Sequence, residues 1–326
     1  MNNLLARYAE CIFWMARYME RAENLARIID VHETFSRDRF GGQNWQSIIQ
    51  LNADERRFFS RYDAVTAENV VNFYVLDSEN PTSIVSAVRA ARENARTLRP
   101  LISTEMWSQI NVFYNWLLDL GPEDCALPNV TRLCTAVKEN SQTHTGIIEG
   151  TFYRDEGWFF YQLGKYIERT DQTTRLLDIK YHILQPFGEE PGSALDVSQW
   201  NSLLRSAAGY HAFRRVHPSG MSPAAVASFM LHNESFPRSV AFGVRQIDSL
   251  LGRLHSRYSL LAASGALEKV DEIQAALVSR TVEQVIVSGL HEHLDWLQLR
   301  LSDVTTEISR AFFGLAPRVQ TQQQGS

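Results

Sequence analysis

The same charged helical pattern occurs twice in this chain, at positions that differ by 148. The first copy, RYMERAENLARIID, spans 17–30, and the second, KYIERTDQTTRLLD, spans 165–178. Each copy carries a Glu-Arg pair at the same place, Glu20–Arg21 in the first and Glu168–Arg169 in the second. A repeat this long is not the short period of a solenoid, so it predicts a chain built from two related halves.

A second pair of matching segments follows in the same order. NPTSIVSAVR at 80–89 aligns with FPRSVAFGVR at 236–245, at an offset of 156. The difference between the two offsets gives the second half eight extra residues, which we place in the loop LQPFGEEPGSALD. We therefore predict two fused pseudo-repeats of about 150 residues. The predicted division is a first pseudo-repeat at 1–150, a second at 151–316 and a disordered polar tail at 317–326.

Apolar residues recur at helical spacing along most of the chain, as at Ile12, Met15 and Met19, and strand patterns are scarce. The pattern predicts an all-α fold, a helical bundle with long antiparallel helices. The NPTS segment predicts a helix N-cap at Asn80 followed by Pro81 in the first turn. Long helices are predicted at about 3–36, 82–119, 129–153, 156–185, 237–264 and 269–313, and shorter ones near 66–76, 196–208 and 222–231.

Polar residues of the two repeated segments fall on one narrow stripe when each segment is drawn as a helix with 100° per residue. Their spacing of 3, 4 and 3 places each side chain within reach of the next. Trp14 and Tyr18 lie beside the stripe of the first copy. The predicted binding residues are these stripes and the two flanking arginines: Arg17, Glu20, Arg21, Asn24, Arg27, Lys165, Glu168, Arg169, Gln172 and Arg175.

Three interpretations of these stripes remain open from the sequence. They can be structural ion pairs between two packed halves, because a buried charge that loses its partner costs about 3–5 kcal/mol. They can form an anion or peptide site in which the guanidinium groups hold a carboxylate or phosphate. They can also support acid–base catalysis by Glu20 or Glu168, with a pKa tuned by the arginines.

Charge and motif content narrow the classes of function. The formal net charge of −5 argues against a nucleic-acid surface, which needs a basic surplus. The sequence has no glycine-rich phosphate loop, no Gly-x-Ser-x-Gly elbow and no cysteine nucleophile motif, so binding is favoured over catalysis and no cofactor is expected. His291 and Asp295 have the spacing of a helical metal-binding pair, but no second pair accompanies them, and we expect no metal site.

Several features predict a cytoplasmic protein without a membrane span. The apolar run near the N-terminus is interrupted by Arg7 and Glu10, unlike a secretory signal. No stretch of eighteen apolar residues occurs. The cysteines Cys11, Cys125 and Cys134 are odd in number and lie in apolar surroundings, which is typical of free thiols in a reducing compartment.

The two charged segments resemble the Glu-Arg motif of the alpha-E family, a family of uncharacterised bacterial helical proteins. Further landmarks of the resemblance are LLARYAECIFWMARYMER near the start, RENARTLRPLISTEMW from Arg92, DEGWFFYQLGKYIER from Asp155 and PRSVAF from Pro237. The resemblance extends over nearly the whole chain. It implies an all-α fold, in agreement with the helical periods.

The resemblance also implies a genomic setting, because members of the family are encoded beside ATP-grasp amidoligase-like and transglutaminase-like proteins. These two classes are the expected partners. The expected function is that of an accessory or peptide- or carboxylate-binding component of an amidoligase-type peptide-modification pathway. Two alternatives stand beside it: an enzyme that uses the Glu/Arg site on a carboxylate substrate, and a helical assembly scaffold without a ligand.

Overall fold

The computed structural model describes residues 4–37, 45–184, 194–218, 220–258 and 263–314, and all regular structure within these ranges is helical, as predicted. The predicted tail and most of the predicted insertion loop lie outside the described residues. The helices up to the middle of the chain are α1 (Ala6–Arg37), α2 (Gln46–Leu51), α3 (Glu55–Phe59), α4 (Ala67–Val75), α5 (Ile84–Thr97), α6 (Thr104–Leu118), the 3₁₀ turn η1 (Pro122–Cys125) and α7 (Leu127–Thr151).

The remaining helices complete the bundle. They are α8 (Glu156–Leu184), α9 (Ala194–Ser206), α10 (Tyr210–Val216), α11 (Pro223–His232), α12 (Val240–Tyr258), α13 (Ser264–Ser279), α14 (Val282–Ile308) and the π-helical turn η4 (Ser309–Phe313). No helix in the described part of the chain is both long and apolar enough to span a membrane.

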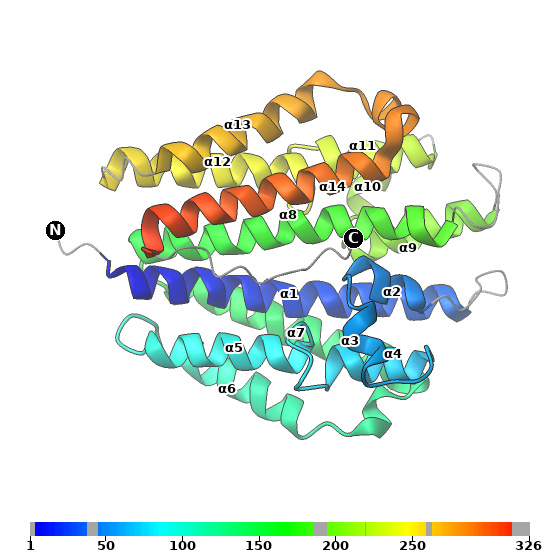
Figure 1. Cartoon of the computed structure of the whole chain (residues 1–326), viewed down its shortest axis with the longest axis horizontal. Coiled ribbons are helices and arrows are strands. Elements are labelled where there is room, and N and C mark those ends of the chain that lie inside the picture. Colours follow the sequence, from blue (N-terminus) through cyan, green and yellow to red (C-terminus); the bar gives the residue numbers. More distant parts are fainter. Residues whose placement is uncertain (1–3, 38–44, 185–193, 219, 259–262, 315–326) are drawn as a thin grey trace.

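Helices α1 and α8 lie side by side through the middle of the molecule (Figure 1). On one side α1 packs against α5 and α7, and on the other side α8 packs against α12 and α14. Helix α1 is buried around most of its circumference, so both apolar residues such as Ile12 and ionised ones such as Glu20 are enclosed. A surface helix would bury only one stripe. The fold therefore places the charged motif in the interior of the bundle.

The central pair of helices runs parallel, which differs from the predicted antiparallel packing of the long helices. The backbone amide of Leu4 donates to Glu156 at the start of α8, and Arg17 contacts Glu168 further along, so the contacts advance in the same direction on both helices. Helix α7 runs antiparallel to α1, as the ion pair of Asp30 with Lys138 and the hydrogen bond of Thr131 to Glu33 indicate. A tight turn after α7 then sends α8 back in the direction of α1.

A glycine permits the close approach of the two central helices. A Cβ atom built on Gly164 of α8 would lie 2.3 Å from the carbonyl oxygen of Phe13 in α1 and 3.2 Å from Cβ of Ala16. Real Cβ atoms do not approach a backbone oxygen this closely, so a larger residue would push the helices apart. The small side chain at this crossing therefore sets the distance across which the charged residues meet.

Two predicted long helices are broken by residues that cap the next helix. The segment predicted as one helix at 82–119 divides before α6, where the Ser103 side chain accepts a hydrogen bond from the Met106 amide. The segment predicted at 269–313 divides at Thr281, which forms a capping box with Gln284. Side-chain oxygens at these positions satisfy the first amides of the new helix.

The predicted cap at Asn80 is also wrong. Helix α5 is capped by Ser83, whose side chain accepts from the amide of Ser86. The side-chain oxygen of Asn80 instead accepts from the amide of Thr82, two residues on, which is the pattern of an Asx turn. The NPTS segment is therefore a turn that leads into the helix, and the helix begins three residues later than its sequence predicts.

Candidate functional site

The two Glu-Arg pairs exchange partners across the contact between α1 and α8. Glu168 accepts hydrogen bonds from Nε of Arg17 at 2.7 Å and from Nε and Nη2 of Arg21 at 2.7 and 3.1 Å. Glu20 accepts in the same way from Nε and Nη2 of Arg169, at 2.7 and 2.8 Å. The side chains of Glu20 and Glu168 are only 3% and 1% exposed. The motif of each helix is thus completed by the motif of the other.

Glu20 has a further partner, Arg238, which belongs to the segment that leads into α12. Nη1 of Arg238 lies 3.4 Å from Glu20 and donates to the side-chain oxygen of Asn24 at 2.8 Å. Its Nη2 donates to Glu23 at 2.6 Å. The side chain of Arg238 is 11% exposed. This arginine therefore joins three residues of α1 from a distant part of the sequence.

The outer arginine of each stripe binds the C-terminal end of a short helix that is distant in the sequence. Arg27 pairs with Glu23 on its own helix at 2.6 Å and donates through Nη1 to the carbonyl oxygen of Ser206, the last residue of α9, at 2.9 Å. Arg175 pairs with Asp171 at 2.9 Å and donates through Nη1 to the carbonyl oxygen of Leu51, the last residue of α2, at 3.1 Å.

Arg175 and Arg27 thereby satisfy carbonyl groups at helix C-termini, which have no partner inside their own helix.

The other predicted binding residues lie at the margin of these contacts. The amide of Asn24 donates to Glu20 at 3.3 Å, and that of Gln172 reaches Glu168 at 3.5 Å. Lys165, which matches Arg17 in the aligned copies, is directed elsewhere, to Gln162 at 3.4 Å and towards Glu149 at 4.0 Å. The structure therefore gathers nine of the ten predicted residues along the α1–α8 contact, with Lys165 beside them. They form three neighbouring groups of ion pairs and hydrogen bonds, which together we call the network.

The aromatic residues predicted beside the first stripe cover its arginines. The guanidinium carbon of Arg17 lies 4.9 Å from the ring centre of Trp14, and that of Arg21 lies 5.7 Å from the ring centre of Tyr18. Both separations are within the range of a cation–π contact. The rings shield these guanidinium groups from water and so strengthen their attraction to Glu168.

Electrostatic effects hold the two central carboxylates firmly ionised. Burial by itself raises the pKa of Glu168, but the charges of Arg21 and Arg17 outweigh it and lower that pKa to about 2. Burial opposes the arginines in the same way at Glu20, where Arg169 and Arg238 lower the pKa to about 2. Neither carboxyl group takes up a proton near neutral pH.

The positive charge of Arg238 is stabilised less by its surroundings than that of Arg21. Burial would lower the pKa of the Arg21 guanidinium, but Glu168 outweighs it and raises that pKa. For Arg238, burial and the neighbouring charge of Arg169 together prevail over Glu23 and Glu20, and its pKa falls to about 10. The charge of this arginine is therefore incompletely compensated by the protein.

A count of charges gives the same result for the network as a whole. Six arginines against four carboxylates leave a surplus of two positive charges. A buried charge without compensation is costly, so a surplus of this kind favours an anion from outside. The members are Arg17, Arg21, Arg27, Arg169, Arg175 and Arg238 with Glu20, Glu23, Glu168 and Asp171.

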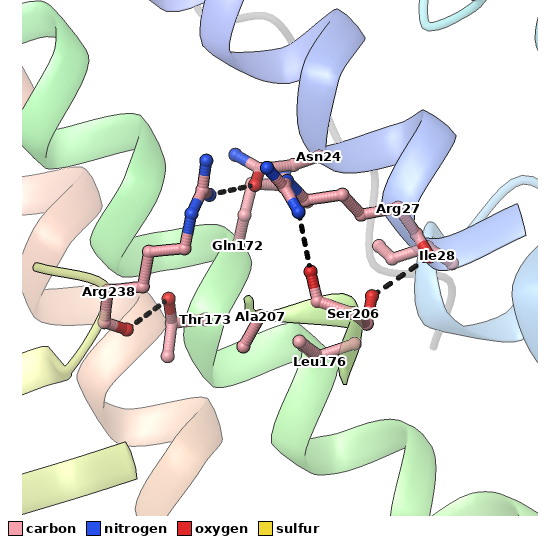
Figure 2. Close-up of a pocket in the computed structure, with 9 residues that line it drawn as sticks. All are labelled: Asn24, Arg27, Ile28, Gln172, Thr173, Leu176, Ser206, Ala207 and Arg238. Atoms are coloured by element: carbon pink, nitrogen blue, oxygen red, sulfur yellow. Dashed lines mark hydrogen bonds between the residues drawn. The ribbon is translucent and has the colours of Figure 1, made fainter. Parts of the chain in front are cut away.

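A small cavity lies beside the poorly compensated arginine. Figure 2 shows Arg238 and Arg27 approaching it from two sides, with the side chain of Asn24 between them. The cavity has a volume of about 10 Å³, measured for the centre of a water molecule, which is room for one water. The lining residues are Asn24, Arg27, Ile28, Gln172, Thr173, Leu176, Ser206, Ala207 and Arg238.

Some members of the network were missed by reasoning from the sequence, although signals for two of them were present. Glu23 and Asp171 are acidic residues at matching positions of the aligned copies, four residues before the outer arginines. Arg238 belongs to the second pair of matching segments, but the first segment has Thr82 at that position, so the repeat gave no hint of it. The carbonyl group of Ser206 had no sequence signal.

Comparisons with known proteins find relatives that match most of this chain. An uncharacterised protein of Mycobacterium bovis is 24% identical over 310 residues, which cover 87% of this chain and 34% of that protein. An uncharacterised protein of Mycobacterium tuberculosis matches with the same identity and coverage. This chain thus spans about a third of the length of the curated relatives it matches. No solved structure matches it.

The paired Glu-Arg segments have a counterpart among known families. A family model, Alpha-E, described as a predicted alpha-helical domain with a conserved ER motif, matches residues 4–313. The match covers both charged helices and nearly all of the bundle around them. With its all-helical fold and its two Glu-Arg pairs at the centre, this chain belongs to the Alpha-E family.

Proposed function

We propose that this protein is a binding component that takes up a carboxylate at the cavity between Arg27 and Arg238, and that it serves an amidoligase-type peptide-modification pathway as an accessory protein in the cytoplasm. The observation that carries the binding proposal is the incompletely compensated charge of Arg238 beside that cavity. A carboxylate would supply the missing negative charge and accept hydrogen bonds from planar guanidinium groups.

The size of the cavity limits the part of a ligand that it can hold. A space for one water-sized particle takes a single carboxylate oxygen, and the rest of a peptide would lie outside it. Gln172 and Arg238 line the cavity and are each partly exposed, so a ligand can approach along these side chains. The proposed ligand is therefore an end or side-chain carboxylate rather than an internal stretch of peptide.

The enzymatic alternative is less well supported by the same geometry. A general base works best when its pKa is near the working pH, whereas Glu20 and Glu168 have a pKa of about 2. Each carboxylate is also held by two arginines, which leaves little freedom to reach a substrate. These groups bind charge but are poorly suited to transfer protons.

The scaffold alternative is favoured by a different observation. The hydrogen bonds of the network connect α1 with α8 and with the segment before α12, and the outer arginines fix the ends of α2 and α9. Such a network specifies how helices meet without any ligand. The two functions make different use of Arg238. A scaffold needs the contacts of Arg238 within the protein, whereas a binding site needs the surplus positive charge of Arg238.

Carboxylate binding can be tested with a pair of peptides that differ only at the C-terminus. A short peptide with a free C-terminal carboxylate should bind in calorimetric titration, and its C-terminal amide should not. Arg238→Gln should weaken binding by tenfold or more, about 1.4 kcal/mol. Arg245→Gln is the matched control, because Arg245 is an exposed arginine of α12 that pairs with exposed Glu234.

Equal binding of the two peptides, or equal affinity of the Arg238→Gln and parent proteins, would exclude this site. If no carboxylate binds while the helices remain intact, the scaffold alternative is preferred.

The proposed pathway has its own test. Deletion of this gene should reduce the product of the proposed ATP-grasp amidoligase-like partner, and the two proteins should co-purify with the proposed transglutaminase-like one. The relatives are about three times as long as the matched region, which is consistent with this helical unit working beside other domains. An unchanged product profile in the deletion strain would count against the pathway but not against carboxylate binding.

We also propose that the chain consists of two copies of one half, at 1–150 and 151–316. Matching positions of the two halves make matching contacts, which supports the proposal. Helices α4 and α11 are capped by Thr66 and Ser222, at an offset of 156. Helices α5 and α12 follow the same rule: Arg89 donates to the carbonyl of Ser78, and 156 residues later Arg245 donates to that of Glu234.

A further inference from the structure

A cluster of basic side chains on α9 and α10 lies outside the arginine network. Arg205 belongs to the last turn of α9, and His211, Arg214 and Arg215 belong to α10. All four side chains are exposed. Residues three and four positions apart share one face of a helix, so the three residues of α10 face the same side. We call Arg205, His211, Arg214 and Arg215 the α10 basic face.

The α10 basic face has no acidic neighbours along the chain. The segment 197–233 contains no aspartate and no glutamate, although the chain as a whole has a net charge of −5. In the described part of the structure, none of the three arginines of this face forms an ion pair. The guanidinium carbon of Arg205 lies 4.8 Å from the ring centre of Tyr210, which leaves its charge uncompensated. The positive charge of this face is therefore left to solvent or to a binding partner.

The matching segment of the first half balances its arginines. At the offset of 156 this segment is 41–77, which also has three arginines but has five acidic residues. Arg57 of α3 pairs with Asp54, and Arg61, which follows α3, pairs with Asp77 at 2.6 Å. Arginines in the last turn of a helix favour its dipole, but this effect is small at the surface. Short helices at this place in the bundle thus do not require unpaired arginines, which points to a further role for those of the second half.

Aromatic contacts hold α10 against the segment that carries Arg238. Phe213 lies on the buried side of α10, and its ring centre is 5.5 Å from that of Phe229 in α11. Phe229 stacks at 4.7 Å on Phe236, which is two residues before Arg238. A Cβ atom on Gly209 would lie 2.9 Å from the ring of Phe236, so this glycine lets the α9–α10 turn approach the ring. The α10 basic face and Arg238 are therefore parts of one packed unit.

The α9–α10 turn also forms a wall of the carboxylate cavity. Ser206 and Ala207, which directly follow Arg205, line the cavity (Figure 2), and α10 begins three residues later at Tyr210. Helix α10 has seven residues and is about 10 Å long, which is the span of about three extended peptide residues. A peptide whose carboxylate enters the cavity can therefore reach the basic face with its next few residues.

We propose that the ligand of the carboxylate site is an acidic peptide, with one carboxylate in the cavity and further carboxylates against the α10 basic face. This inference rests on the carboxylate binding proposed above and specifies the charge of the rest of the ligand. Planar guanidinium groups donate paired hydrogen bonds to carboxylates, so acidic side chains match this face. A neutral peptide would fill the cavity equally well but would leave Arg205, Arg214 and Arg215 without anionic partners.

Two short peptides of equal length, both ending in alanine with a free carboxylate, test this proposal by calorimetric titration. One peptide carries glutamates before the alanine, and the other carries glutamines at the same positions. The acidic peptide should bind the parent protein about tenfold more tightly at low salt, because several exposed ion pairs each contribute modestly. Added salt should reduce this preference by screening the charges.

Variants locate the preference on the protein. The double variant Arg214→Gln, Arg215→Gln should bring the two affinities close together, whereas Arg238→Gln should weaken both and keep their ratio. The matched control combines Arg56→Gln and Arg132→Gln, which remove exposed arginines of α3 and α7, and it should keep the preference of the parent. Circular dichroism verifies that each variant keeps its helices.

Equal affinities of the two peptides for the parent would overturn this proposal and leave the carboxylate site intact. A preference that persists in the double variant would place the acidic residues elsewhere and overturn the proposal as well. So would a single-stranded oligonucleotide of equal charge that binds this face more tightly than the acidic peptide, because it would identify a nucleic-acid surface. If Arg238→Gln changes neither affinity while the double variant removes the preference, the cavity proposal fails and the α10 basic face remains the binding surface.

Discussion

Replacement of Glu168 by alanine tests whether the central network stabilises the fold. The change removes the acceptor of three hydrogen bonds of 2.7–3.1 Å and leaves Arg17 and Arg21 facing each other without the carboxylate between them. Their side chains are only 12% and 18% exposed, so water compensates poorly. Loss of one partner from a buried pair of this kind costs about 3–5 kcal/mol.

The pKa of Glu168 provides a second route to this magnitude. Its lowering from 4.5 to about 2 corresponds to about 3 kcal/mol of preferential interaction with the ionised form, at 1.36 kcal/mol per pKa unit. An unfolding entropy of about 2.1 cal/mol/K per residue gives roughly 0.7 kcal/mol/K for a chain of 326 residues. A loss of 3–5 kcal/mol therefore lowers the melting temperature by about 4–7 °C.

Scanning calorimetry and urea denaturation at pH 7 measure this loss. The matched control is Glu234→Ala, because Glu234 has an arginine at a similar distance, 2.8 Å, but both partners are more than half exposed. An exposed pair contributes little, so the control should melt within about 1 °C of the parent. If Glu168→Ala melts within the same interval, the argument from buried charge is refuted.

Three further predictions concern pH, packing and the division of the chain. Because the pKa of Glu20 and Glu168 is lowered, their contribution to stability is complete above about pH 4.5 and is lost as the pH falls towards 2. Glu168→Gln should therefore flatten this part of a stability–pH curve measured by urea denaturation, and an unchanged slope would contradict the prediction. Gly164→Ala should destabilise the protein by about 1–3 kcal/mol because its Cβ clashes with Phe13. Gly146→Ala on α7, where a Cβ meets nothing within 4 Å, should instead stabilise it by about 0.5–1 kcal/mol, and equal melting temperatures of the two variants would rule out the close helix crossing. Fragments 1–153 and 154–326 should each fail to fold alone, because the arginines that pair with Glu20 and Glu168 lie in the other fragment. The co-expressed fragments should form a folded complex by circular dichroism and gel filtration, and a single fragment that folds alone would contradict this dependence.

The sequence predicted the members of the network better than it predicted their pairing. Helical spacing placed Arg17, Glu20 and Asn24 on one stripe, and the structure brings them together with the second copy. Spacing along one helix reports only neighbours three or four residues away, so it could not show that Glu20 pairs with Arg169. That choice depends on how the helices cross, which Gly164 controls.

Helix types were predicted more reliably than helix ends for a similar reason. Apolar periodicity continues through Ser103 and Thr281, where the chain turns, because the residues on both sides face the same core. The breaks arise from hydroxyl groups that accept from the next helix, a local signal that is weaker than the long period around it. The short helices α2 and α3 were missed because five or six residues give too little periodicity to detect.

The reciprocal exchange between Glu20 and Glu168 also bears on how such a bundle could arise. Two identical half-length chains carrying this motif would join by the same exchange, as an isologous dimer about a twofold axis. In such a dimer every substitution appears on both sides of the axis, so both cavities remain alike. Once the halves are fused, each can change alone: Thr82 and Arg238 stand at matching positions, yet only Arg238 reaches the network. A single gene can thus keep the stabilising contacts of a symmetric dimer while it confines a specialised cavity to one side.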